Sequence, residues 1–210
     1  QTYYHTIPLP EGMEHFERVP YLSPQYIFRR STISYHRNKE QRVRAVFMII
    51  IFLDIDGVLR PFGHQDVNNR VFPNGTLAAL AHVLAQIPAA QLVLSSTWRV
   101  QTSFIHVIVE DFRAYGGVLK DTDFYDITDP ALHSERQHEI YEWLERRGRH
   151  PDVRAWIALD DEELLEGEPN AAIRHLFEQH VVKTDSHTGM TMEDARLAVT
   201  LLQNQLEQHS

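Results

Sequence analysis

The sequence has 210 residues, no cysteine and a formal charge of −9, with 43% hydrophobic and 23% charged residues. This length fits one domain of ordinary size with an appended segment. The lack of cysteine excludes disulfides, thiolate zinc sites and thiol catalysis, and it is typical of a reducing compartment such as the cytoplasm. No apolar run approaches the ~20 residues that span a bilayer, so we expect a protein that does not cross a membrane.

The first 47 residues differ in charge from the rest of the chain. Residues 1–47 carry seven basic against four acidic residues, a balance of +3, whereas residues 48–210 carry −12. The lead segment has no helical or alternating period and contains four prolines, which predicts an irregular or disordered lead followed by one autonomous domain over 48–210. The basic lead is either a solvated linker or a segment that recruits an anionic partner.

The first expected strand covers residues 48–53 and runs directly into acidic residues. Six consecutive apolar residues precede Asp54, Asp56 and Gly57. Such a continuous run is typical of a parallel strand that is buried on both faces. Two carboxylates at this spacing repel each other unless a cation or a shared proton relieves them. The pattern indicates either a metal-assisted site at the end of the strand or an Asp-Gly hairpin turn.

Strands and helices are expected to alternate along the rest of the domain. The pattern predicts further strands at 91–94, 118–119, 155–159 and 181–184, and helices at 76–87, 101–115, 134–147, 169–178 and 191–208. We expect Asn74 or Thr76 to cap the first of these helices, and Gly116 with Gly117 to end the second. The alternation predicts an α/β fold in which a central parallel sheet has helices on both faces.

Polar residues follow three of the expected strands. Asp54 and Asp56 follow the first strand, Ser95 follows the second, and Asp160 with Asp161 follows 155–159. By itself Ser95 is explained as a strand-end cap, and the two adjacent acids as the start of a helix. Ligands of parallel sheets gather at the carboxyl ends of the strands, so the three motifs together indicate a functional site at one sheet edge.

The motifs do not indicate a zinc site, a calcium loop or a nucleotide-binding loop. None of the thirteen histidines stands in a His-Glu-x-x-His spacing, which argues against zinc. Gly57 follows Asp56 directly and does not take the sixth position of a calcium loop. Gly116-Gly117 lacks the spacing of a phosphate-binding loop or a dinucleotide fingerprint.

The order of the motifs resembles that of the haloacid dehalogenase-like (HAD) hydrolases, over residues 48 to about 202. Members carry a strand followed by Asp-x-Asp-Gly, a strand that ends in Ser or Thr, a Lys or Arg on a later helix, and a strand that ends in acids. The matching residues are Asp54-Ile55-Asp56-Gly57, Ser95, a basic residue near 136, and Asp160-Asp161. The resemblance implies a Rossmann-like three-layer sandwich.

A narrower resemblance concerns three stretches of the sequence. Ser95-Ser96-Thr97-Trp98-Arg99, residues 156–161, and Thr184-Asp185 followed by Gly189-Met190-Thr191 are similar to the HAD domain of Swiss-army-knife RNA repair-like proteins. The substrates of that branch are poorly defined.

The resemblance implies a role for each acidic residue. It makes Asp54 the nucleophile that forms an aspartyl-phosphate, and Asp56 the acid and base of the two half-reactions. It implies Mg²⁺, which prefers hard oxygen ligands, held by Asp54, the main-chain carbonyl of Asp56 and Asp161. Asp160 either binds the ion too or orients the basic residue.

The resemblance also implies groups that bind the phosphate and the substrate. Ser95 would hydrogen-bond a phosphoryl oxygen. The basic position falls to Arg136 or Lys120, and we prefer Arg136 because it opens the helix that leads to the strand with the paired acids. Three further residues are candidate substrate contacts, namely Arg60, Ser96 and Arg99. Trp98 is either a core residue or a platform for a base.

Spacing predicts how open the site is. Only 37 residues separate Gly57 from Ser95, and 40 separate Ser95 from Arg136, which leaves no room for a cap domain. An open site suits large substrates, with the loop residues Arg60, Phe62 and His64 tuning specificity.

Together with the resemblance, these observations predict a Mg²⁺-dependent phosphatase, a phosphomonoester hydrolase. The sequence does not identify its phosphorylated substrate, and we prefer a nucleotide or a nucleic-acid end slightly over a phosphoprotein. The alternative is a non-catalytic, metal-binding interaction domain with a recruiting lead segment. The intact Asp54/Asp56 pair counts against this alternative, because a binding module has no need of an acid/base group.

Overall fold

The computed structural model describes residues 47–65, 70–129, 131, 135–146, 152–166 and 172–208. All of these residues belong to the unit Arg44–Ser210. The predicted irregular lead therefore lies outside the described residues, apart from Phe47. Parts of the helices expected at 134–147 and 169–178 lie outside them as well.

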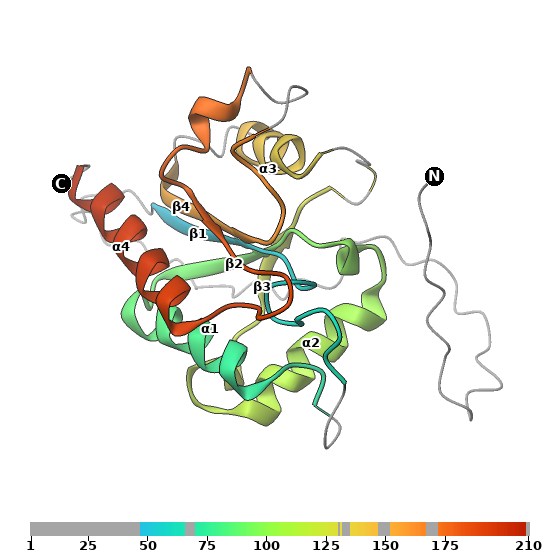
Figure 1. Ribbon diagram of the computed structural model, residues 1–210. Coiled ribbons are helices and arrows are strands. Elements are labelled where there is room, and N and C mark those ends of the chain that lie inside the picture. The colour runs from blue at the N-terminus through green and yellow to red at the C-terminus, as the bar shows by residue number, and fades with distance from the viewer. Residues whose placement is uncertain are drawn as a thin grey trace, which may run out of the picture. The chain divides into compact units, whose positions relative to one another are not determined.

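Five strands in the described part of the chain form one parallel sheet (Figure 1). Their order is β3-β2-β1-β4-β5, so β1 lies in the middle with β2 and β4 on either side. Because all strands run the same way, their carboxyl ends share one edge of the sheet. The strands are β1 (Met48–Leu53), β2 (Ala90–Leu94), β3 (Phe124–Ile127), β4 (Val153–Asp160) and β5 (Val181–Lys183).

Helices cover both faces of the sheet. The bounds are Asn74–Gln86 for α1, Thr102–Tyr115 for α2, Arg136–Glu145 for α3 and Met192–Gln208 for α4. Figure 1 shows α1, α2 and α4 on one side of the sheet and α3 on the other. These three layers confirm the predicted Rossmann-like α/β fold. No helix among the described residues is both long enough and apolar enough to cross a membrane.

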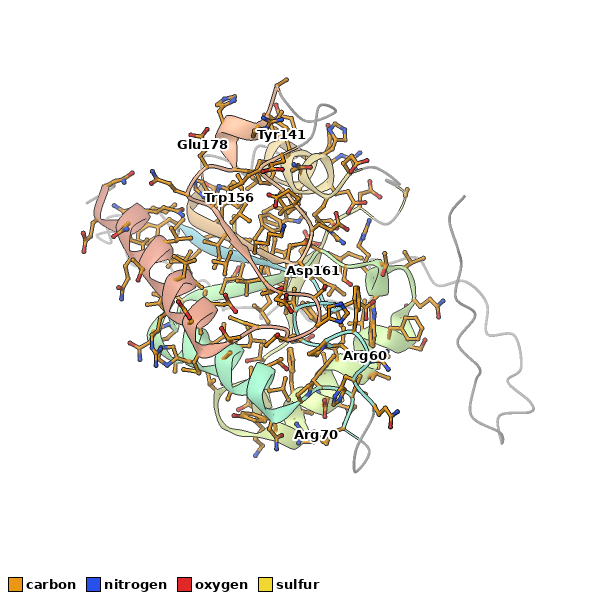
Figure 2. All side chains as sticks on the ribbon, in the orientation of Figure 1. Arg60, Arg70, Tyr141, Trp156, Asp161 and Glu178 are labelled. Atoms are coloured by element: carbon orange, nitrogen blue, oxygen red, sulfur yellow. The ribbon has the colours of Figure 1, made fainter. Side chains whose placement is uncertain are left out.

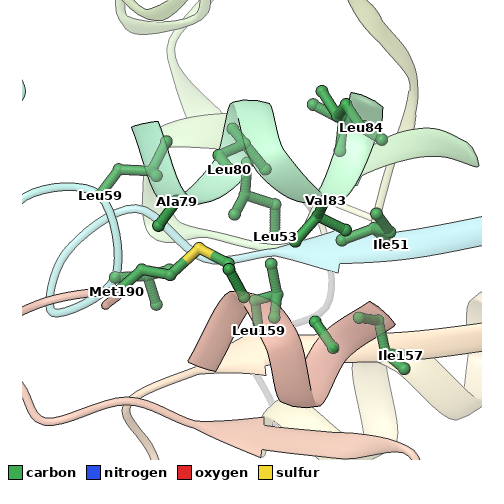
Figure 3. Packing of buried hydrophobic residues seen from close by; sticks show 14 of the residues in the cluster. Ile51, Leu53, Leu59, Ala79, Leu80, Val83, Leu84, Ile157, Leu159 and Met190 are labelled. Carbon is green, nitrogen blue, oxygen red and sulfur yellow. The ribbon is translucent and has the colours of Figure 1, made fainter. Parts of the chain in front are cut away.

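The central strand β1 is buried on both faces. Ile51 and Leu53 point to the side of α1 and α4, where they join Val83 of α1 in one apolar cluster (Figure 3). Phe52 points to the opposite side, where its ring centroid lies 5.2 Å from that of Trp143 in α3. Burying each such side chain contributes about 1.5–3 kcal/mol. The strand is therefore a firm support for the residues that follow it.

The third strand differs from the prediction. Val118 and Leu119 belong to a 3-10 helix, Gly117–Asp121, and the strand is Phe124–Ile127. The strand prediction at 118–119 is wrong because the two apolar residues do not share one environment: Leu119 enters the core and Val118 is exposed. The actual β3 is a four-residue edge strand, too short to give a clear alternating signal.

The starts of α1 and α4 are capped differently. Neither Asn74 nor Thr76 caps α1, because the helix already begins at Asn74 and Pro73 takes the cap position. The hydroxyl of Thr76 donates to the carbonyls of Leu59 (2.8 Å) and Pro73 (3.0 Å). That cap prediction is wrong. The start of α4 is a reciprocal cap in which Thr191 N–H donates to Asp194 Oδ2 (2.8 Å) and Asp194 N–H donates to Thr191 Oγ1 (3.2 Å).

Two other helix predictions have different outcomes. The end of α2 is as predicted, because Gly116 follows it with a φ of 88°, a conformation that glycine adopts readily. In the described part of 169–178, the chain forms only a short 3-10 turn, Arg174–Leu176.

Candidate active site

Three carboxylates converge at the carboxyl edge of the sheet. Asp54 follows β1, Asp160 ends β4 and Asp161 comes next, and an oxygen of each lies within 4.8 Å of the others. The pairing of β1 with β4 brings them together, because the Asp54 N–H donates to the carbonyl of Leu159 at 3.0 Å. Figure 2 labels Asp161 and also Arg60, which lies on the loop after β1. The predicted convergence of these acids is present in the structure.

Gly57 allows the loop after β1 to approach Asp161. Its φ is +73°, which side chains rarely tolerate, and a Cβ at this position would lie 2.2 Å from Asp161 Cγ. The hydroxyl of Thr184, just after β5, donates to the Gly57 carbonyl at 2.8 Å. The glycine is thus required by both backbone conformation and space, and the Asp161 carboxylate is held against the loop.

Arg136 brings the predicted phosphate-binding groups to the same place. Its side chain is only 6% exposed, with Nε 3.1 Å from Asp160 Oδ2 and Nη2 3.6 Å from Asp54 Oδ2. Nη1 donates to Ser95 Oγ at 3.4 Å. The first residue of α3 therefore places one guanidinium between the ends of β1, β2 and β4.

Lys120, the other candidate for the basic position, lies elsewhere. It is exposed in the 3-10 helix Gly117–Asp121, which precedes β3. Because β3 is parallel to the other strands, the chain that enters it lies at the amino edge of the sheet. Arg136 and Lys120 are therefore at opposite edges, and only the Arg136 guanidinium lies beside the acids.

A buried acid that the motifs did not reveal links two arginines. Glu139 Oε1 accepts from Arg99 Nη2 at 2.6 Å, and its Oε2 lies 3.7 Å from Arg136 Nη1. Arg99 Nη1 also donates to the carbonyl of Ser96 at 2.8 Å. Arg99, a candidate substrate contact, is thus held in a buried ion pair. Sequence reasoning missed Glu139 because its three-residue spacing from Arg136 is ordinary in helices.

Burial raises the pKa values of the three clustered carboxylates. It raises the pKa of Asp54 to about 6, against the opposing effects of Arg136, a hydrogen bond from Ser96 and the Ile55 N–H. Burial and the charge of Asp54 raise the pKa of Asp160 well above its usual range. Burial also raises the pKa of Asp161. The three carboxylates are therefore costly to ionise together.

The charges of the site fit a divalent cation. Three buried acids face two buried guanidiniums, and two half-buried acids add further negative charge. The donors are all carboxylate oxygens, which are the ligands that Mg²⁺ prefers. The groups counted are Asp54, Glu139 and Asp160; Arg99 and Arg136; and Asp56 and Asp161. The excess of carboxylates, together with the close group of three, makes this a candidate metal site.

Asp56 has its own partner outside that group of three. Its Oδ2 accepts the indole N–H of Trp98 at 2.8 Å. Arg60, a predicted substrate contact, lies beside the same ring, with Cζ 5.8 Å from the ring centroid. Sequence reasoning left Trp98 open between a core and a stacking role, because a contact between residues 42 positions apart leaves no local pattern.

The loop after β1 is fastened to the loop after β5. The Phe62 N–H donates to the carbonyl of Ser186 at 2.8 Å, and the Phe62 ring meets that of His187 at a centroid distance of 6.0 Å. Phe62 is 53% exposed. The specificity role of this loop, in which we included Arg60 and His64, stays a prediction.

Comparison with known proteins identifies a family. The family model described as the HAD domain in Swiss Army Knife RNA repair proteins matches residues 50–195. No curated protein and no solved structure matches the chain. The matched range covers every candidate residue of the site, from Asp54 to Asp161.

Proposed function

Since the chain belongs to the family of HAD domains in Swiss Army Knife RNA repair proteins, it is a HAD-type hydrolase, and we propose that it is a Mg²⁺-dependent phosphomonoester hydrolase. One observation carries the proposal. The buried Asp54 carboxylate lies close to the Arg136 guanidinium and to two further carboxylates, at the carboxyl edge of a parallel sheet. This combination supplies a nucleophile, a phosphate-binding cation and a set of metal ligands at one place.

In the first step Asp54 attacks the phosphate. Its Oδ1 accepts the Ile55 N–H at 2.8 Å, which limits rotation of the carboxylate. An Asp54 oxygen forms a bond to phosphorus, the bond from phosphorus to the leaving oxygen breaks, and Asp56 gives its proton to that oxygen. Arg136 and Ser95, already 3.4 Å apart, would hydrogen-bond the phosphoryl oxygens.

In the second step the aspartyl-phosphate is hydrolysed. Asp56 takes a proton from a water molecule, whose oxygen attacks phosphorus. The bond between phosphorus and Asp54 then breaks, and inorganic phosphate leaves. Both carboxyl groups return to their starting states, so Asp56 serves as acid in one step and base in the other.

Mg²⁺ has a defined place in this proposal. It would offset the repulsion between the phosphate and the carboxylates. Asp54, Asp160 and Asp161 would hold it, with the main-chain carbonyl of Asp56. Asp160 would serve two purposes, because its Oδ2 also orients Arg136.

We propose a nucleotide or a nucleic-acid end as the substrate. The description of the matched family refers to RNA repair. Phe62 is exposed on the loop after β1, and Arg60 of the same loop lies beside the Trp98 ring. Aromatic faces stack on bases and arginine attracts phosphates, so these residues suit such a substrate.

The direct test compares wild type with Asp54→Asn on p-nitrophenyl phosphate, with Mg²⁺ and with a chelator. We expect Mg²⁺-dependent turnover in wild type and a loss of at least about a thousandfold in the variant. Radiolabel from a labelled substrate should remain on acid-denatured wild-type protein and be absent from the variant. Asp126→Asn is the control, since Asp126 accepts an indole N–H from Trp143 outside the site.

Two results would contradict the proposal. Full activity of the Asp54 variant would remove the nucleophile, and turnover without a divalent cation would remove the metal. If wild type hydrolysed no member of a broad phosphoester panel, and partner binding were lost on deleting residues 1–47, the chain would be an interaction domain instead.

A further inference from the structure

The indole of Trp98 reaches across the site to the acid/base residue. Trp98 lies in the 3-10 helix Thr97–Val100 that follows β2, and Asp56 lies in the loop after β1. Trp98 Nε1 donates to Asp56 Oδ2 at 2.8 Å, a short and partly buried hydrogen bond. The contact joins the ends of two neighbouring strands.

The indole packs against two other aromatic rings. Its centroid lies 6.2 Å from that of Phe72 and 5.1 Å from that of Phe104. On the main chain, the Trp98 N–H donates to Ser96 Oγ at 3.4 Å. A ring fixed by these neighbours is a donor of defined position, so the hydrogen bond restrains the carboxylate more than it restrains the ring.

We propose that Trp98 is a positioning residue for Asp56, an inference that rests on the proposed function. An indole N–H can only donate, so Asp56 Oδ2 is the accepting oxygen. This leaves Oδ1 to carry the proton that passes to the leaving oxygen and later to take one from water. Trp98 selects the side-chain rotation of Asp56 and thereby the oxygen that does the proton transfer.

Two substrates with different leaving groups distinguish a positioning role of Trp98 from a purely structural one. Phenyl phosphate has a poor leaving group that needs a proton, whereas p-nitrophenyl phosphate has a good one that needs little help. Trp98→Phe removes the N–H and keeps an aromatic ring. We expect kcat/KM for phenyl phosphate to fall about tenfold or more, and kcat/KM for p-nitrophenyl phosphate to fall less than about threefold.

The chain supplies a matched control. Trp143 Nε1 donates to Asp126 Oδ2 at 3.0 Å, the same kind of contact between two residues that have no role in the proposed mechanism. Trp143→Phe should change both substrates by the same factor. For a sharper comparison, benzothienylalanine at position 98 keeps the shape of the indole and replaces its N–H with sulfur, which tests the hydrogen bond if Trp98→Phe disturbs folding.

A double variant tests whether Trp98 acts through Asp56. If it does, Trp98→Phe in an Asp56→Asn background should cause no further loss of kcat/KM. Equal losses for both substrates, or the same loss in the Asp56→Asn background, would overturn the assignment. If wild type is active and the variants leave the ratio of the two substrates unchanged, the assignment of Trp98 fails alone. If wild type hydrolyses neither substrate, the proposed function fails with it.

Discussion

The two halves of β4 bury polar groups in opposite ways. In its amino-terminal half, an edge cluster of Trp156, His180 and Gln205 satisfies the strand with neutral hydrogen bonds. The Trp156 N–H donates to Gln205 Oε1 (2.9 Å), and the Trp156 carbonyl accepts from Gln205 Nε2 (3.0 Å) and His180 Nδ1 (2.8 Å). At its carboxyl end, Asp160 joins Asp54 and Asp161 in the acidic site, where carboxylates outnumber the guanidiniums.

The edge cluster stabilises the fold, whereas the acidic site leaves charge that a ligand can balance. The side-chain amide of Gln205 bonds the main chain of β4 at Trp156, where β5 does not pair with it. Burial lowers the pKa of His180, which keeps its ring neutral. In the acidic site, burial raises the pKa of Asp54 to about 6 because the chain does not balance the charge. The edge cluster is complete without a ligand, whereas the acidic site has the charge and the ligands for a cation and a phosphate.

The largest effect should come from removing the guanidinium of Arg136 from the acidic site. Arg136→Met leaves Asp54 and Asp160 without their shared partner. We expect turnover of p-nitrophenyl phosphate to fall by roughly a hundredfold or more, and the free energy of unfolding at neutral pH to fall by about 3–5 kcal/mol. Lys120→Met, at the other edge of the sheet, is the control and should change neither. Unchanged turnover in Arg136→Met would remove this residue from the proposed mechanism.

The next effect concerns the fit of the loop against Asp161. Gly57→Ala places a methyl group where Asp161 Cγ would be 2.2 Å away, so the carboxylate must move. We expect the Mg²⁺ concentration for half-maximal turnover to rise about tenfold or more. Gly63→Ala imposes a similar strain, since φ is +81°, but its Cβ meets no atom within 4 Å. If both variants gave the same rise, strain and not the contact with Asp161 would be the cause.

The pH dependence of the free energy of unfolding should distinguish the acidic site from the edge cluster. When a chelator keeps the protein free of metal, Asp54 stays protonated in the folded protein between pH 3.8 and about 6. In the unfolded chain Asp54 has already lost this proton. The stability from Asp54 is therefore present below pH 3.8 and lost as the pH rises through about 6, by up to about 3 kcal/mol. Mg²⁺ should oppose this loss. His180 acts in the opposite direction, because its lowered pKa costs stability below pH 6.5.

Urea unfolding at pH 4.5 and 7.5 measures this dependence. The difference between wild type and Asp54→Asn reports the titration of Asp54 together with its effect on the pKa of Asp160, since groups away from the site titrate alike in both. A wild type whose metal-free stability rises between these pH values as steeply as that of Asp54→Asn would contradict the raised pKa of Asp54.

The smallest effect should come from the edge cluster. Gln205→Ala removes both partners that the amide supplies to Trp156. We expect a loss of about 1–3 kcal/mol in the free energy of unfolding, with kcat unchanged. Gln203→Ala is the control on the same helix, because Gln203 is exposed and the change in helix propensity is the same. A loss of turnover in Gln205→Ala would mean that the two regions are coupled.

Strong local patterns in the sequence were sufficient for much of the fold. The unbroken apolar run before Asp54 predicts a central strand, and in the structure that strand is buried on both faces. Gly116 predicts the end of α2, since a left-handed residue there favours glycine. The strand at Phe124–Ile127 was missed because four residues at a sheet edge have weak periodicity. The helix α1 has no side-chain cap because Pro73 takes the cap position.

The sequence by itself determined the order of strands and helices and the motifs that follow them, because these depend on residues close together in the chain. Tertiary structure decided which side chains meet. Strand pairing brings Asp54 beside Asp160, and the direction of β3 separates Lys120 from Arg136. The contacts of Glu139 with Arg99 and of Trp98 with Asp56 join residues about 40 positions apart. Such contacts depend on strand pairing and on the packing of α3 against the sheet, which no local pattern records.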